Sequence, residues 1–281
     1  MGSKTRRSIG LIIFGVAGNV SITKLFLAGI VPGLLMGLAI GATWWWLAKK
    51  ENVRAAVKPP MAERLRITAE GGFALALPIV IIGGMKFGVF TPTEAAVVAA
   101  VYSFCVGMFI YRELKWSALY KLMLAAGKTT AVVMFLVAAA MVSAWLITVA
   151  NIPTEVAAML SPFMDNKILL MLVMMLLIVV VGTALDFTPT VLILTPVLMP
   201  VVLKAGIDPV YFGVMFIMNN AIGLITPPVG TVLNVVCGVA RISMDTAFKG
   251  VLPFLLAQLA VLFLLVLFPA IVIVPLHWWM R

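Results

Sequence analysis

Long apolar runs separated by short polar or basic segments make up most of the chain. A helix needs about 20 mainly apolar residues to cross the hydrocarbon core of a bilayer. The apolar run 8–20 is too short for this and indicates half of a broken helix, whereas the mixed segments 61–70 and 153–167 indicate interfacial helices. The pattern predicts membrane spans over residues 25–47, 73–90, 95–111, 129–150, 210–240 and 251–279.

Two further apolar arms, 168–185 and 187–203, are joined by Asp186 without a polar loop. This arrangement predicts a helical hairpin that enters and leaves the membrane by the same side. In lipid, a broken helix leaves backbone N–H and C=O groups that each cost several kcal/mol unless protein, water or a ligand satisfies them. Broken helices at membrane depth are therefore typical of the sites of transporters.

The hairpin tip is the first candidate site. The arm that begins near Thr188 presents free N–H groups and a positive dipole end, which suit a carboxylate. The arm that ends near Thr183 presents free carbonyl groups, which suit a cation. An acidic residue within an apolar run is by default a functional candidate, although Asp186 could instead simply cap the following helix.

A second break interrupts the span 210–240. Pro227 and Pro228 cannot continue the incoming helix, and Gly223 and Gly230 allow close approach or positive φ. The carbonyl groups freed before the prolines suit a hard cation such as Na⁺, although a plain proline kink would explain the pattern too. The two breaks predict a Na⁺ site at Thr183, Asp186, Gly223, Thr226, Pro227 and Gly230, and a substrate site at Thr188, Pro189, Thr190, Asn219, Asn220 and Asn234.

Composition supports an all-α polytopic membrane protein, since 64% of the residues are hydrophobic and only 11% are charged. The net charge of +10 does not indicate nucleic-acid binding, because the basic residues lie in short loops between apolar runs. Twelve of them follow residues 47, 111 and 240, which predicts that these loops are cytoplasmic and that the hairpin opens outward. The opposite loops hold only Lys24, Lys86, Lys167, Lys204 and Arg281.

The chain offers little for catalysis, and we expect no enzyme. The only histidine, His277, lies beside Trp278 at the end of the last apolar run, where an interfacial anchor is expected. Cys105 and Cys237 lie in apolar runs without a Cys-x-x-Cys motif, which is typical of small buried side chains.

Several stretches together closely resemble the large membrane subunit (DctM-like permease) of tripartite ATP-independent periplasmic (TRAP) transporters, nearest the branch associated with 2,3-diketo-L-gulonate. They read KLFLAGIVPGLLMG, FGVFTPTEAA, KTTAVVMFLVAA, LDFTPTVLILTPVLMP, GIDPVYFGVMFIMNN and GLITPPVGTVLNV. The resemblance implies an elevator-type Na⁺ symporter in the bacterial inner membrane. It also implies a small membrane subunit and a periplasmic solute-binding protein that delivers an organic acid. By the same resemblance, Asp186 and Thr226-Pro227-Pro228 line the Na⁺ and substrate sites.

Members of that family are longer and consist of two inverted repeats, so the resemblance implies that most of the first repeat is missing. We therefore expect the chain not to transport by itself. The expected segments are a residual half-helix (1–24), a span with a cytoplasmic arm (25–70), three spans with a periplasmic arm (71–166), the site region (167–250) and a last span (251–281). A uniporter, a channel or another anion carrier would also use broken helices and stays an alternative.

Overall fold

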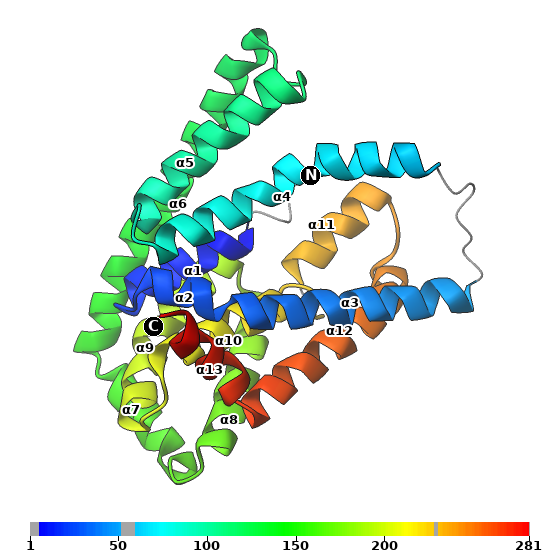
Figure 1. Cartoon of the computed structure of the whole chain (residues 1–281). Helices are drawn as coiled ribbons and strands as arrows, with labels where there is room; N and C mark the ends of the chain where they lie inside the picture. Colours follow the sequence, from blue (N-terminus) through cyan, green and yellow to red (C-terminus); the bar gives the residue numbers. More distant parts are fainter. Residues whose placement is uncertain (1–5, 52–59, 228–229, 281) are drawn as a thin grey trace. The chain divides into compact units, whose positions relative to one another are not determined.

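The computed structural model describes residues 6–51, 60–227 and 230–280, and the regular elements of these residues are all helical (Figure 1). Seven helical segments among them are long and apolar enough to cross a membrane. The predicted all-α polytopic membrane protein is therefore confirmed. The chain divides into two compact units, one formed by residues up to 47 together with 136–279 and the other by residues 48–135.

The second unit contains α4 (Met61–Lys86), α5 (Pro92–Cys105) with a π-helical turn (Val106–Ile110), and the first part of α6 (Trp116–Val149). The prediction of a separate interfacial helix at 61–70 was wrong, since α4 runs on through Gly71 and Gly72. No proline stands at that point, and glycine weakens a helix without stopping it. Likewise α6 begins at Trp116 and includes the basic stretch before the expected span.

A capping box starts α5. The Glu94 carboxylate accepts a hydrogen bond from the Thr91 N–H at 2.7 Å, and Thr91 Oγ1 accepts one from the Glu94 N–H at 3.4 Å. Together with Pro92 in the first turn, this pair satisfies donors that the helix end would otherwise leave free. The sequence Thr91-Pro92-Thr93-Glu94 is typical of such a helix start and predicts it, and the structure confirms it.

The first unit begins with α1 (Arg6–Ala17), α2 (Ile22–Ala28) and α3 (Ile30–Lys50), the last of which extends past its boundary. The unit continues with the end of α6, α7 (Ile152–Leu160) and a 3₁₀ turn (Ser161–Phe163). It then comprises α8 (Lys167–Ala184), α9 (Phe187–Lys204), α10 (Pro209–Gly223), α11 (Thr231–Ala240), α12 (Met244–Leu267) and α13 (Ala270–Trp279).

Two predicted spans of the first unit also differ from the structure. The first apolar span is divided by a turn at Gly29 into α2 and α3. The last span was predicted over 251–279, but α12 starts earlier, at Met244, where the Ser243 hydroxyl accepts a hydrogen bond from the Thr246 N–H at 3.3 Å. Helix α12 ends before Pro269, which lacks the N–H needed to continue it, and α13 follows.

Helix α10 is the central element of the first unit (Figure 1), and α1, α2, α8, α9 and α12 all contact it. Its side chains are buried on nearly every face, as expected for a helix that is apolar all round. Phe216 of α10 packs on Phe14 of α1 with ring centroids 5.5 Å apart. The Tyr211 hydroxyl donates to the Leu265 carbonyl of α12 at 3.0 Å. These contacts fix the helix whose end reaches the candidate site.

Candidate functional site

The predicted breaks are both present. Helix α8 ends at Ala184 and α9 begins at Phe187, with Leu185 and Asp186 extended between them. Helix α10 ends at Gly223 and α11 begins at Thr231. In the second break Pro227 is half-buried, and Pro228 lies outside the described residues.

The second break ends at a position that only glycine tolerates well. Gly230 has a φ of +47°, and a Cβ there would lie 3.1 Å from the Thr226 carbonyl oxygen. A side chain at Gly230 would thus meet both backbone strain and a close backbone atom. The Thr226 hydroxyl donates back to the Ile222 carbonyl at 2.8 Å, which holds the outgoing chain against the end of α10.

Hydrogen bonds join the two breaks. The Gly230 N–H donates to the Thr183 carbonyl at 3.3 Å, and the Thr231 hydroxyl lies 3.4 Å from Asp186 Oδ1, to which it donates. Asn220 Nδ2 donates to the Phe187 carbonyl at 3.1 Å. The structure therefore brings the carbonyl end of α8, the start of α9 and the start of α11 to one place.

Small residues allow α8 and α10 to approach closely at the same level. A Cβ on Gly223 would lie 3.1 Å from the Gly182 Cα, and a Cβ on Gly182 would lie 3.0 Å from Asn220 Oδ1. Contacts of this kind let helix backbones pack directly in membrane proteins. They leave the carbonyl groups and amide oxygens around Gly182 near one another.

Asn219 and Asn220 provide buried acceptors. Both side chains are fully buried, and each Nδ2 donates to a backbone carbonyl, that of Met175 for Asn219 and that of Phe187 for Asn220. The Oδ1 atoms of both are buried without a hydrogen-bond partner in the described part of the chain. A buried acceptor without a donor typically costs about 1–3 kcal/mol, so these oxygens are suited to a cation or a donor from a ligand.

The site has the ligand chemistry of a hard cation rather than that of a transition metal. No group of three or more His, Cys, Asp or Glu residues is placed to hold a metal among the described residues. Backbone carbonyls, amide oxygens and threonine hydroxyls lie at or beside the breaks instead, and these are ligands that hard cations prefer. The donor set fits Na⁺, which would bind through such oxygens.

Asp186 holds the N-cap position of α9 by its backbone, but its side chain makes no capping hydrogen bond there. The exposed carboxylate accepts a hydrogen bond from Thr231 of α11 instead. The Asp186 carbonyl oxygen accepts from the fully buried Thr190 hydroxyl at 2.9 Å. The alternative in which the Asp186 side chain merely caps the following helix is therefore wrong.

The remaining predicted residues lie around these contacts. Thr188 and Pro189 are half-buried in the first turn of α9, and the Thr183 hydroxyl donates within α8 to the Val180 carbonyl at 2.8 Å. Asn234 lies exposed in the first turns of α11. Thr188, Pro189 and Asn234 take part in none of the hydrogen bonds described above that join the two breaks.

Sequence reasoning missed Gly182, Thr231 and the Phe187 carbonyl as members of the site. Gly182 and Thr231 each lie beside a break, and this position in the sequence could have identified them as candidates. Their partners lie on other helices, and no local spacing identifies such pairs. The Phe187 contact uses the backbone, which carries no signal in residue identity.

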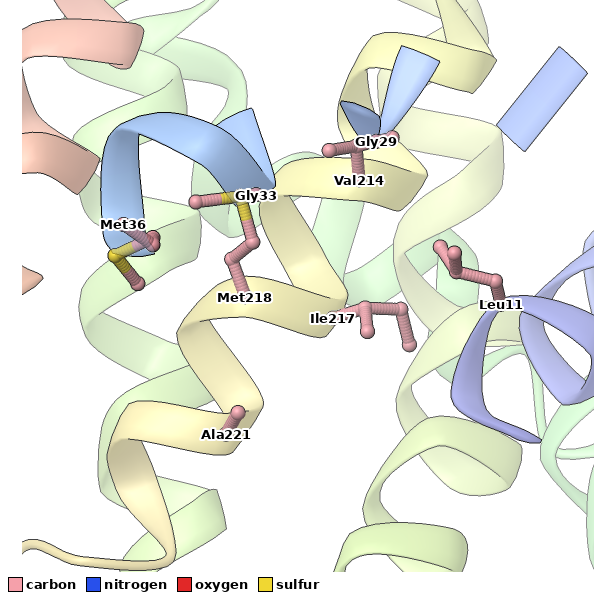
Figure 2. Close-up of a pocket in the computed structure, with 8 residues that line it drawn as sticks. All are labelled: Leu11, Gly29, Gly33, Met36, Val214, Ile217, Met218 and Ala221. Carbon is pink, nitrogen blue, oxygen red and sulfur yellow. The ribbon is translucent and has the colours of Figure 1, made fainter. Parts of the chain in front are cut away.

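A separate cavity of about 200 Å³ lies between α1, the turn between α2 and α3, and α10. Figure 2 shows that the lining residues of α10 are Val214, Ile217, Met218 and Ala221. With a period of 3.6 residues, these positions face away from Asn219, Asn220 and Gly223. Its lining is apolar and is completed by Leu11, Gly29, Gly33 and Met36, so the cavity is distinct from the joined breaks.

Comparison with known proteins identifies the family. Residues 7–271 match the model of the tripartite ATP-independent periplasmic transporter, DctM component. The 2,3-diketo-L-gulonate TRAP transporter large permease protein YiaN of Escherichia coli is 52% identical over 271 residues, which cover 96% of this chain and 64% of YiaN. The C4-dicarboxylate TRAP transporter large permease protein DctM of Pseudomonas aeruginosa is 34% identical with the same coverage. The sialic acid TRAP transporter large permease protein SiaM of Vibrio cholerae is 37% identical, covering 93% of this chain and 61% of SiaM.

The chain thus spans slightly less than two thirds of the length of these relatives. The match nevertheless covers nearly all of the chain, including both breaks. The family consists of transporters and not enzymes, and its members reside in the inner membrane. The chain belongs to the DctM component family of tripartite ATP-independent periplasmic transporters and is a multi-pass inner-membrane protein.

Proposed function

We propose that the chain forms the permease part of a Na⁺-coupled importer for a small organic acid. A periplasmic solute-binding protein delivers the acid, and a small membrane subunit completes the transporter within the lipid bilayer. The observation that carries this proposal is the joining of two helix breaks by Gly230, Asn220 and Thr231. It brings the N–H groups of helix starts and the carbonyl groups of a helix end to one place. A single unbroken helix would not offer both kinds of group there.

The proposed cation side consists of the end of α8 and the connection after α10. When bound there, Na⁺ would be held by oxygen atoms of both breaks and would link the two breaks electrostatically. The residues assigned to it are Thr183, Asp186, Gly223, Thr226, Pro227 and Gly230. The Gly230–Thr183 hydrogen bond supports this assignment, because it brings the end of α8 to the connection after α10. The unpartnered Oδ1 atoms of Asn219 and Asn220 lie in the adjoining last turns of α10.

The proposed substrate side uses the starts of α9 and α11. The N–H groups of a first helical turn and the positive end of the helix dipole favour a carboxylate. Thr188, Pro189 and Thr190 lie in the first turn of α9, and Asn234 lies near the start of α11. The relatives are named for 2,3-diketo-L-gulonate, C4-dicarboxylates and sialic acid, all of which are organic acids.

Asn219 and Asn220, which the sequence also predicts as substrate residues, differ from these groups. Their donors are engaged with backbone carbonyls, so only acceptor oxygens remain. A carboxylate would be repelled by such oxygens, whereas a cation or a hydroxyl group of a sugar acid would be attracted. Any contact of Asn219 or Asn220 with the substrate is therefore with a hydroxyl group of the acid, and the same oxygens remain suited to a cation.

The movement proposed for this site is of the elevator type, with α8 and α9 as a re-entrant hairpin that opens outward. The connection of the two arms by Leu185 and Asp186 alone supports the hairpin, because no longer polar loop separates them. Neutralisation of the site by both ions would lower the cost of moving it through lipid.

Uptake by proteoliposomes tests the function. The chain, the small subunit and the portion of the relatives' length that the chain does not span are reconstituted together, with binding protein and radiolabelled acid outside. We expect uptake that needs an inward Na⁺ gradient and the binding protein, and no uptake with a K⁺ gradient. Uptake that needs neither Na⁺ nor the binding protein would support a uniporter or a channel instead.

A further inference from the structure

Asn220 occupies an unusual position between the two breaks. It lies in the last turns of α10, is fully buried, and forms a hydrogen bond to the other break through its side chain. Its Nδ2 donates to the carbonyl of Phe187, the first residue of α9. This hydrogen bond fixes the orientation of the amide, so that Oδ1 points to the other side.

The Oδ1 atom of Asn220 is buried without a partner in the described part of the chain and lies beside Gly182 of α8. A Cβ on Gly182 would come within 3.0 Å of this oxygen. Oδ1 therefore lies close against the backbone of α8, and a side chain at Gly182 would displace it. A buried acceptor without a donor, held close to the carbonyl end of α8, is suited to a small cation.

From this geometry we propose that Asn220 has two roles, as an oxygen ligand of the coupling cation and as the residue that transmits cation binding to the start of α9. This inference rests on the proposed Na⁺ coupling and names a ligand and a route within that site. A cation at Oδ1 would shift the amide, and the Nδ2–Phe187 hydrogen bond would carry that shift to the first turn of α9. That turn holds Thr188 and Thr190, which we assign to the substrate.

Asn219 does not share this arrangement, although it is equally buried and its Oδ1 also lacks a partner. Its Nδ2 donates to Met175, about two turns before Gly182 along α8. No contact links Asn219 to the start of α9 or α11 among those that join the breaks. The proximity of Asn220 to both Gly182 and Phe187 is what distinguishes it.

Thermal unfolding of the purified chain in detergent tests the proposal without transport. Na⁺ is titrated at constant ionic strength with choline, and the rise of Tm gives the Na⁺ concentration of half-maximal stabilisation. We expect Asn220→Ala to raise this concentration about tenfold or more, because one buried ligand of a charged group is lost. Gly182→Ala should act in the same direction, since its methyl group would lie 3.0 Å from Oδ1 and displace it.

Two further variants separate the roles and control for damage. Asn220→Asp keeps an oxygen but not the donor, so it should retain the Na⁺ response and lose part of the Tm measured without Na⁺. Tyr211→Phe removes a buried hydrogen bond from the same helix to Leu265, well away from the breaks. It should lower Tm without changing the half-maximal Na⁺ concentration by more than about twofold.

The outcomes distinguish this inference from the proposed function. No Na⁺-specific rise of Tm in the parent chain would overturn the Na⁺ assignment and this inference together. A normal rise in the parent, with the same half-maximal concentration in Asn220→Ala and Gly182→Ala, would leave Na⁺ coupling intact and overturn the role of Asn220. If Asn220→Ala does not fold, Gly182→Ala decides in the same way.

Discussion

The crossing of α8 and α10 at Gly182 and Gly223 leads to a quantitative prediction about stability. In Gly223→Ala the added Cβ would lie 3.1 Å from both the Cα and the carbonyl carbon of Gly182, and 3.3 Å from the Val179 carbonyl oxygen. All three atoms belong to the backbone of α8, so no side chain can rotate away. The two helices must separate by a few tenths of an ångström instead.

Two opposing terms decide the size of the effect. Overpacking of a close contact costs about 1–3 kcal/mol, and separation would also weaken the hydrogen bond from Asn220 to Phe187. Replacing glycine by alanine in a helix returns at most about 1 kcal/mol, and less at Gly223 because it is the last residue of α10. We expect a net loss of about 1–2 kcal/mol, which corresponds to several degrees in Tm for a chain of this size.

Gly238 supplies the matched control. It lies within α11, and a Cβ built on it meets no atom within 4 Å. Gly238→Ala should therefore leave the stability unchanged or raise it by up to about 1 kcal/mol. Thermal and denaturant unfolding of both variants and the parent, in the same detergent, measures the difference. If Gly223→Ala is as stable as Gly238→Ala, the described contact between α8 and α10 does not limit their approach.

Three other predictions concern the site and its surroundings. In the reconstituted transporter, Asp186→Ala and Thr226→Ala should raise the Na⁺ concentration for half-maximal uptake more than they lower the amount of protein; unchanged Na⁺ dependence in both would remove these residues from the cation site. Single cysteines at Thr188 and Leu203 should react only with reagents added from the periplasmic side, as the outward-opening hairpin requires, and cytoplasmic labelling of Thr188 in the resting state would contradict it. Thr91→Ala should destabilise the start of α5 by about 0.5–2 kcal/mol through loss of its cap, seen as faster hydrogen exchange in that turn, whereas exchange equal to that of the parent would show that the cap is dispensable.

Helix boundaries could be predicted from the sequence where a local chemical signal sets them. Thr91, Pro92 and Glu94 formed the expected capping box, and Asp186 and Gly223 lie at the expected breaks. Prediction failed where length and hydropathy were the only guides. The charged residues at the start of α4 suggested a separate interfacial helix, yet nothing in that stretch stops a helix.

The candidate site was predictable in its location but not in its connections. Breaks show in the sequence because glycine and proline alter the backbone directly. The pairing of Asp186 with Thr231, or of Asn220 with Phe187, depends on how α8, α9, α10 and α11 pack. Such packing joins residues 33 and 45 positions apart in the chain, and no periodicity carries that information.

The site is difficult to recognise in the sequence because backbone groups, rather than side chains, make many of its contacts. Of the three hydrogen bonds that join the breaks, one lies between backbone groups and another ends on a backbone carbonyl. In such a site, the backbone geometry limits which residues are tolerated more than the chemistry of the side chains does. It demands glycine where helices touch, as at Gly182 and Gly223, and where φ is positive, as at Gly230. Substitutions there should therefore act first on helix packing and only through it on ion binding.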